Sequence, residues 1–182
     1  AFGMKPDWDL GIMREGQSPS EVGRECLRGI EEVVREWHPD LVLVQGDTAT
    51  VFFGAVAAYL HGIAVGHVEA GLRSGDLMRP FPEEGFRRMV AQVADLHFAP
   101  TEGARENLLR EGVPAERIHV TGNTVVDALL HVADRGEPPS DETVRRLTAP
   151  GAPPFILLTA HRRESMGRPL ERIFEAARDL VS

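Results

Sequence analysis

The sequence predicts an α/β fold built on a doubly wound parallel sheet. Short apolar runs alternate with amphipathic segments of helical period along the chain. Polar and apolar residues do not alternate within the apolar runs. Such continuous runs are typical of parallel strands that helices cover on both faces. Glycine, proline and small polar residues separate the two kinds of segment, as expected of the turns in such a fold.

The first predicted helix runs from Pro19 to about Trp37. Ser18 and Glu21 have the spacing of a capping box, and Pro19 stands at the first helical position, where a missing N–H leaves no hydrogen bond unmade. Apolar residues recur at helical spacing along this segment until Pro39 ends the pattern. The segment therefore predicts one amphipathic helix with a defined start and stop.

Strand and helix then alternate to the end of the chain. The apolar runs predict strands at 40–45, 63–69, 96–100, 118–122 and 155–160. The segments between and after them predict helices at 50–61 (capped by Thr48), 82–93, a stretch from Thr101 to Gly112, 124–134, and a last one from Pro169. The Pro- and Gly-rich stretch 136–154, with one short helical turn, predicts a linker or long connection.

Charge and composition narrow the range of functions. The formal net charge is −8 and the pI is about 5.4, which argues against nucleic acid as the main partner. We see no apolar run long enough to span a membrane and no signal peptide, so a cytoplasmic protein is expected. The chain also lacks a P-loop and a G-x-G-x-x-G fingerprint, which weakens the case for NTP hydrolysis or nicotinamide chemistry.

Three ionisable residues stand where predicted strands end: Asp47, Glu69 and His161. Ligands of doubly wound sheets bind beyond the carboxyl ends of the strands. Asp47 alone would more readily be a turn or capping residue, but three such groups on one edge favour a site. A metal held by His67 and Glu69 has little support, because no second histidine stands at ligand spacing.

Five motifs occur in a fixed order along the chain. They are GDTAT (46–50), HVEAGLRSGD (67–76), PFPEE (80–84), TGNTVVDAL (121–129) and HRRES (161–165). Together they closely resemble the motifs of the non-hydrolysing bacterial UDP-N-acetylglucosamine 2-epimerases. The resemblance covers essentially the whole chain.

This resemblance implies a glycosyltransferase-B architecture, in which two Rossmann-like domains face each other, usually in a homodimer. It implies the interconversion of UDP-GlcNAc and UDP-ManNAc for cell-surface polysaccharide synthesis, without a metal or another cofactor. In the family reaction UDP leaves C1, a base removes the acidified C2 proton to give 2-acetamidoglucal, and protonation from the other face followed by return of UDP gives the epimer. Groups that give and take a proton on opposite faces of the sugar are therefore expected.

Compared with the family pattern, the chain is expected to be incomplete at both ends. Residues 1–134 are expected to form the N-terminal Rossmann-like domain without its first strand–helix unit. Residues 135–153 are expected to be a linker, and residues 154–182 the start of the C-terminal Rossmann-like domain. The family's G-T-R-P-E-type turn and its D-S-G-G-x-x-E segment, which hold the nucleotide, are not in the sequence.

By resemblance, three carboxylates and one histidine take the catalytic positions: Asp47, Glu69, Glu83 and His161. His161 is expected at the diphosphate, with Arg162 and Arg163 as helpers in substrate binding. Glu84, the second acid of PFPEE, reads instead as a first-turn charge that favours the helix dipole.

Two further residues are candidates for substrate binding. Arg73 could bind substrate or, with equal weight, pair with Asp76 or Glu84. Gln17 resembles the family's G-Q turn, which lies near a regulatory substrate site. Arg87 and Arg88, which follow the PFPEE motif, read as ordinary helix surface.

Three alternatives to an epimerase remain open on the sequence. One is a glycosyltransferase of the same architecture, and another is a hydrolysing relative that releases ManNAc and UDP. The third is a catalytically incomplete UDP-sugar-binding fragment, and on this reading the 182-residue chain would not turn over by itself.

Overall fold

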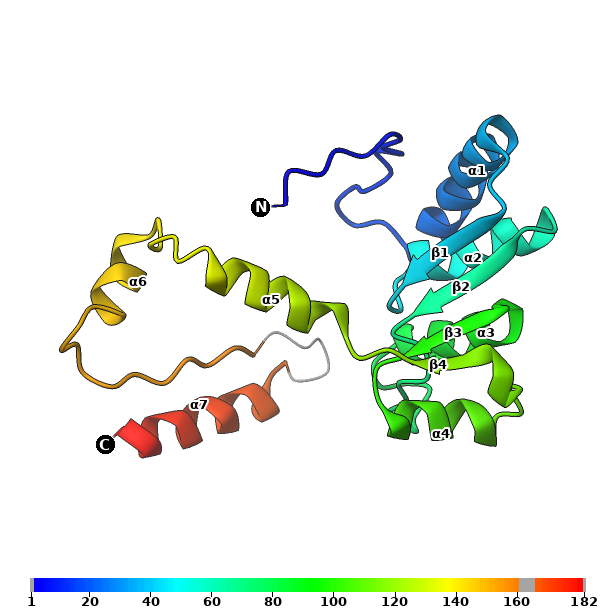
Figure 1. The fold of residues 1–182 in the computed structure, drawn as a ribbon. Coiled ribbons are helices and arrows are strands. Elements are labelled where there is room, and N and C mark those ends of the chain that lie inside the picture. The colour runs from blue at the N-terminus through cyan, green and yellow to red at the C-terminus, as the bar shows by residue number, and fades with distance from the viewer. Residues whose placement is uncertain (1, 161–165, 182) are drawn as a thin grey trace. The chain divides into compact units, whose positions relative to one another are not determined.

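The computed structural model describes residues 2–160 and 166–181 (Figure 1). The chain divides into two compact units, Ala1–Asn123 and Thr124–Ser182. Residues 124–134, which the sequence assigns to the end of the first domain, group with the second unit. The predicted domain boundaries stay a prediction.

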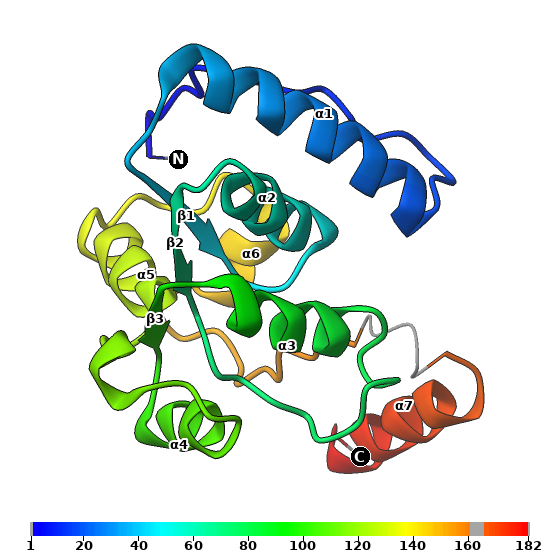
Figure 2. The same ribbon diagram turned by 90° about the vertical axis from the view of Figure 1, so that its right-hand side faces the viewer.

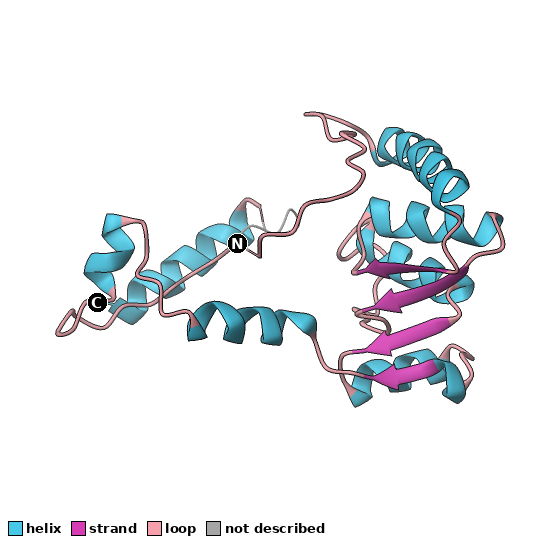
Figure 3. Ribbon diagram, turned by 45° about the horizontal axis from the view of Figure 1, so that its top comes forward, coloured by secondary structure: helices cyan, strands magenta, loops and turns pink. Residues whose placement is uncertain are grey.

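A four-stranded parallel sheet organises the first unit. Its strands are β1 (Leu41–Gln45), β2 (Ala64–Val68), β3 (Leu96–Ala99) and β4 (Ile118–Val120), which lie side by side in chain order (Figure 3). The predicted parallel α/β fold is therefore confirmed. Because all the strands run the same way, their carboxyl ends meet at one edge of the sheet.

Four helices connect and cover these strands. They are α1 (Pro19–Trp37), α2 (Ala49–Leu60), α3 (Glu83–Val93) and α4 (Glu102–Arg110), and a short 3-10 turn precedes β4. α1 packs on α2 and α2 packs on α3, and Figure 2 shows the three side by side. α4 packs against β3 and β4.

The predicted helix starts are confirmed atom by atom. The Ser18 N–H donates to Glu21 Oε2 (2.8 Å) and the Glu21 N–H donates back to Ser18 Oγ (3.3 Å), which completes the capping box. Thr48 caps α2 and Thr101 caps α4, each by accepting a backbone N–H on its hydroxyl. These contacts satisfy N–H groups that have no partner within the helix.

Small and branched side chains fill the core between one face of the sheet and its helices. One cluster contains Val44, Val51, Ala55, Ala58, Val65, Val90 and Ala94. The other contains Ala70, Ala91, Ala99, Ala104, Leu108, Val113 and Ile118. The many alanines let the helices lie close to the strands. Since this core is apolar, a site is expected at the polar ends of the strands.

The second unit contains three helices in its described part: α5 (Thr124–Asp134), α6 (Glu142–Leu147) and α7 (Arg168–Val181). The predicted helices at 124–134 and near Pro169 are confirmed. The strand predicted at 155–160 is wrong, because these residues form no strand. A parallel strand exists only through hydrogen bonds to a neighbour, and the described residues of this unit supply no other strand. Leu157 accordingly stays 86% exposed.

Candidate active site

Asp47 stands on the turn that joins β1 to α2. Gly46, just before it, has a φ of +85°, a conformation that favours glycine. Asp47 Oδ2 accepts two hydrogen bonds from Arg87, one from Nε at 2.8 Å and one from Nη2. The carboxylate is thus held by a guanidinium from α3, and its orientation is fixed by a charge-assisted contact.

Arg87 and Arg88 do not form the ordinary helix surface that the sequence predicted, and Glu84, although a first-turn charge of α3 as predicted, is also buried. Glu84 is fully buried and accepts hydrogen bonds from the Ser74 N–H (3.1 Å), Arg87 Nη1 (3.2 Å) and Arg88 Nε (3.1 Å). The Arg87 side chain is only 16% exposed. Burial alone would raise the pKa of Glu84, but these hydrogen bonds outweigh it and the pKa is lowered.

The physical reason is the loop at 70–79, which folds over the first turn of α3 and covers Glu84. Residues three and four positions apart share one face of a helix, so Glu84, Arg87 and Arg88 point the same way. That spacing of one acid and two arginines is the signal that could have identified the network from the sequence.

Glu83, the first residue of α3, differs from its neighbour Glu84 in the pairing of its carboxylate oxygen atoms. Its Oε2 is buried and has no hydrogen-bond partner among the described residues. Buried polar atoms are nearly always paired in native proteins. This carboxylate oxygen at the start of α3 is therefore a good candidate for a group that meets a ligand.

Glu69 directly follows β2 in a left-handed backbone conformation with φ of +67°. This conformation is costly for a residue other than glycine and is concentrated at functional sites. Glu69 Oε1 accepts a hydrogen bond from Gln45 Nε2 at 3.1 Å. The contact links the ends of β1 and β2, so the side chains of Asp47 and Glu69 are set by the same sheet edge.

The loop after β2 is anchored to α4. A Cβ on Gly71 would lie 2.2 Å from the Ala104 carbonyl oxygen, so only glycine allows this approach. Asn107 Nδ2 also donates to the Gly71 carbonyl oxygen at 2.9 Å. The segment that carries Glu69 is therefore pressed against a helix rather than free in solvent.

Arg73 pairs with neither of the two partners expected from the sequence. Its Nε and Nη2 donate to the carboxylate of Glu111 at 2.8 and 2.6 Å, and its side chain is 6% exposed. The hydrogen bond from Arg73 is the main reason that the pKa of Glu111 is lowered. The sequence could not indicate this partner, which lies 38 residues away. Substrate binding by Arg73 stays a prediction.

Gln17 closes the loop before α1. Its Nε2 donates to the Ile12 carbonyl oxygen (2.7 Å), and its Oε1 accepts from the Arg14 N–H (2.8 Å). The structure thus gives Gln17 a local role in the loop, and its proposed place near a regulatory site stays a prediction. The other predicted residues, His161, Arg162 and Arg163, lie outside the described residues.

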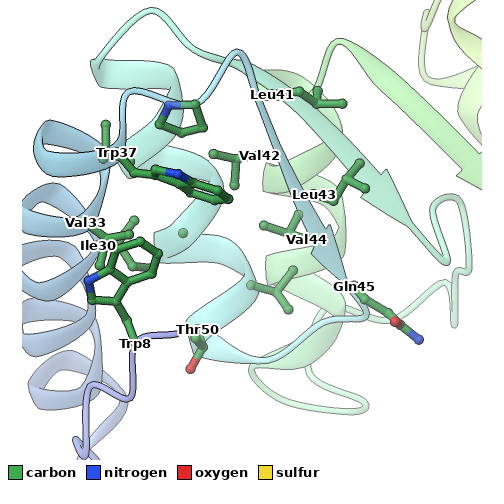
Figure 4. Close-up of a pocket in the computed structure, with 14 residues that line it drawn as sticks. Trp8, Ile30, Val33, Trp37, Leu41, Val42, Leu43, Val44, Gln45 and Thr50 are labelled. Carbon is green, nitrogen blue, oxygen red and sulfur yellow. The ribbon is translucent and has the colours of Figure 1, made fainter. Parts of the chain in front are cut away.

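An apolar groove of about 520 Å³ lies beside β1 (Figure 4). The rings of Trp8 and Trp37 stand 5.5 Å apart at one side of it. Gln45 and Thr50 supply polar side chains, and none of the described residues that line it is ionisable. The described lining of this groove therefore offers no group for acid–base chemistry.

Comparison with known proteins identifies similar sequences along the whole chain. A family model described as UDP-N-acetylglucosamine 2-epimerase matches residues 1–182. The UDP-N-acetylglucosamine 2-epimerase of Bacillus subtilis (strain 168) is 49% identical over 183 residues, which cover 100% of this chain and 46% of that protein. The Yersinia pestis protein of the same name is 48% identical and is covered over 49% of its length. The chain spans about half the length of the curated relatives it matches.

Solved structures agree with these sequence matches. A putative UDP-N-acetylglucosamine 2-epimerase from Listeria monocytogenes superposes with a TM-score of 0.89 at 44% identity, over 98% of this chain and 46% of that one. The UDP-GlcNAc 2-epimerase of Methanocaldococcus jannaschii, in complex with UDP-GlcNAc and UDP, gives a TM-score of 0.82 at 39% identity, over 98% of this chain and 48% of that one. Within the described residues, no helix has the length and apolar character needed to cross a membrane.

Proposed function

Since the chain belongs to the UDP-N-acetylglucosamine 2-epimerase family, we propose that the protein containing it interconverts UDP-GlcNAc and UDP-ManNAc. The proposal is supported by Asp47 and Glu69, which follow the ends of β1 and β2, and by Glu83 at the start of α3, whose Oε2 is buried without a hydrogen-bond partner among the described residues. The M. jannaschii relative, solved with UDP-GlcNAc and UDP, supports the choice of substrate.

The reaction explains why several carboxylates are needed. C2 of the sugar has no neighbouring carbonyl, so its proton is not acidic in the ground state. When the C1–O bond breaks and UDP leaves with the electron pair, the oxocarbenium-like centre acidifies C2–H. A carboxylate then takes that proton to give 2-acetamidoglucal. A carboxylic acid on the other face returns a proton to C2 while UDP re-forms the bond to C1.

Glu83 and Glu69 suit the two proton transfers. Glu83 Oε2 has no partner among the described residues, so it can exchange a proton with a bound sugar without first breaking a hydrogen bond. Among the described residues, Glu69 Oε1 accepts a hydrogen bond from one neutral amide, that of Gln45. Asp47 is held more firmly by Arg87, and we assign it to stabilising the positive charge that develops at C1.

The leaving diphosphate needs cations and donors. Following the family pattern, we assign this task to His161, with Arg162 and Arg163 as helpers. Positive groups fixed around the departing oxygens lower the barrier of the first step. Arg73 and Gln17 are further proposed contacts for substrate or for a regulatory nucleotide sugar.

We further propose that the chain is part of a two-domain glycosyltransferase-B-type enzyme that works in the cytoplasm as a homodimer and needs no cofactor. In this proposal, residues 1–134 belong to the N-terminal domain, 135–153 to a linker and 154–182 to the C-terminal domain. The relatives' length, about twice that of this chain, supports a larger enzyme.

A deuterium experiment tests the proposed reaction. The natural protein that contains this chain is incubated with UDP-GlcNAc in deuterated water, and the products are followed by NMR. UDP-ManNAc with deuterium at C2 is expected, because the removed proton is replaced from solvent. Epimerisation with complete retention of the C2 hydrogen would rule out this mechanism. Release of free ManNAc and UDP would identify a hydrolysing relative instead.

A further inference from the structure

His67 in β2 is a buried histidine that the reaction above does not use. Its side chain is 0% exposed, and its Nε2 lies 2.8 Å from the Gly46 carbonyl oxygen. A carbonyl oxygen only accepts hydrogen bonds, so Nε2 carries the proton. Nδ1 is buried without a partner among the described residues, which leaves no acceptor for a second proton. His67 is therefore a neutral imidazole with a defined tautomer, in agreement with a pKa that burial lowers.

β2 holds Gly46 from both sides. The Gly46 N–H donates to the Val68 carbonyl oxygen at 3.1 Å, while the Gly46 carbonyl oxygen accepts from the His67 imidazole. The second contact falls on the peptide group between Gly46 and Asp47. A peptide group is planar, so holding its oxygen also sets the positions of the Asp47 nitrogen and α-carbon, from which the Asp47 side chain leaves the turn.

Gly46 itself does little to keep the turn in place. Its φ of +85° lies in a region that glycine enters freely, and a Cβ there would meet no atom within 4 Å. Contacts from other residues must therefore select this conformation. His67 supplies one of them from the interior of the sheet, two residues before Glu69, which directly follows the same strand.

We propose that His67 is a positioning residue, which holds the Gly46–Asp47 peptide by its Nε2–H and thereby aims the Asp47 carboxylate at the sugar. The proposal rests on the proposed function for its catalytic consequence. Its structural part, the fixed turn, does not depend on which reaction takes place.

The neighbouring strand offers a matched control. His97 in β3 is the in-register partner of His67, is 1% exposed and likewise has an unpaired Nδ1 among the described residues. Its ring interacts with the backbone of Ala94, the residue that ends α3, and among the described residues it makes no hydrogen bond to a turn that carries a catalytic carboxylate. Equal substitutions at the two positions therefore disturb the core alike but should affect Asp47 differently.

The experiment uses His67→Met, which keeps the volume and removes the donor, and His67→Gln, which returns an N–H donor at about the same reach. His97→Met and His97→Gln are the controls. In the natural protein that contains this chain, His67→Met should lower kcat roughly ten- to hundredfold with KM nearly unchanged, the scale of a misplaced catalytic group. His67→Gln should recover most of the loss, and both His97 variants should keep kcat within about threefold.

Hydrogen–deuterium exchange of residues 45–52, measured by mass spectrometry, tests the turn without any assay of activity. Exchange there should rise in His67→Met and return toward the parent level in His67→Gln. If His67→Met does not fold, the histidine ¹⁵N NMR spectrum of the parent decides the question, since the proposal requires the Nε2–H tautomer for His67.

The outcomes separate the two proposals. If the parent does not act on UDP-GlcNAc, the proposed function fails while the exchange data still test the positioning role. Unchanged exchange at 45–52 in His67→Met would overturn the positioning role. Equal losses of kcat in His67→Met and His97→Met would also overturn it, because the effect would then be one of core packing.

Discussion

Arg87 donates two hydrogen bonds to a single carboxylate oxygen of Asp47, a residue 40 positions earlier in the chain. The contact joins the first turns of α3 to the turn between β1 and α2. Both side chains are mostly buried, with 16% of Arg87 and 27% of Asp47 exposed. Charge-assisted pairs in such partly desolvated places are stronger than surface ion pairs, so this one governs where the Asp47 carboxylate points.

We expect Arg87→Lys to impair activity although it keeps the positive charge. A lysine ammonium cannot reproduce the planar guanidinium that contacts Asp47 and Glu84 at once. In the natural protein that contains this chain, kcat should fall by roughly tenfold or more, with a smaller change in KM. Arg88→Lys is the control, since Arg88 contacts Glu84 from the same helix face. Equal kcat values for the two variants would contradict the role given to Arg87.

Glu84→Gln should reduce both stability and activity. Three donors converge on this buried carboxylate, and the neutral amide leaves at least one buried guanidinium donor poorly paired. The free energy of unfolding should fall by about 2 kcal/mol in urea titrations. Glu102→Gln provides the comparison, because Glu102 also stands in a first helical turn but is 72% exposed beside Arg105. Similar urea midpoints for both variants would show that Glu84 is only a surface charge.

The three proposed catalytic carboxylates should each be needed for turnover. Asp47→Asn, Glu69→Gln and Glu83→Gln are expected to lower kcat by at least roughly a hundredfold, the scale of lost acid–base catalysis. Steady-state rates of C2 epimerisation measure the effect. Asp76→Asn is a matched control, since Asp76 lies on the same loop and is 54% exposed. Wild-type rates in any of the three variants would remove that residue from the mechanism.

Acid should weaken the fold through His97. Burial, with a further contribution from the nearby His67, lowers the pKa of His97 to about 4. A histidine in the unfolded chain has a pKa of about 6.5. Below that pH the unfolded chain therefore binds a proton that the folded chain does not bind. The free energy of unfolding therefore falls as the pH drops from about 6.5 toward the folded-state pKa, by at most about 1.4 kcal/mol per pH unit for this group.

Urea midpoints recorded between about pH 7 and about pH 4.5 check this dependence. His97→Gln removes the titrating group and should make the curve less steep. A curve that is equally steep in His97→Gln would assign the acid sensitivity to other groups.

The 182-residue chain by itself is expected to show no turnover. It spans about half the length of its curated relatives, and fixed donors around the diphosphate are needed to stabilise the leaving group. Expression of residues 1–182 and an NMR assay of C2 epimerisation test this expectation. Activity near that of a full-length relative would mean that this chain holds a complete site.

Local signals predicted most of the first unit. The capping box at Ser18 and the threonine caps at Thr48 and Thr101 act within four residues, so the sequence alone could place those helix starts. The four parallel strands were predicted because continuous apolar runs require cover on both faces. The prediction of a strand at 155–160 was wrong because strand pairing depends on a neighbouring strand, which an apolar run does not reveal.

The site was predicted less completely, because its contacts join distant parts of the chain. Strand ends and motif order indicated Asp47, Glu69 and Glu83. The burial of Glu84 depends on the loop that folds over α3, and the partner of Arg73 is set by the packing of that loop on α4. Neither arrangement can be predicted from a short stretch of sequence.

The contacts that run from Ser74 through Glu84 and Arg87 to Asp47 have a consequence for recombining this chain with its relatives. Any crossover between residues 47 and 84 takes the aspartate from one parent and its guanidinium from the other. In chimeras built at such junctions, α3 comes from one parent and the turn after β1 from the other. Exchange at a junction before β1 or after β4 transfers the four residues together, and those are the places where domain shuffling should preserve the enzyme.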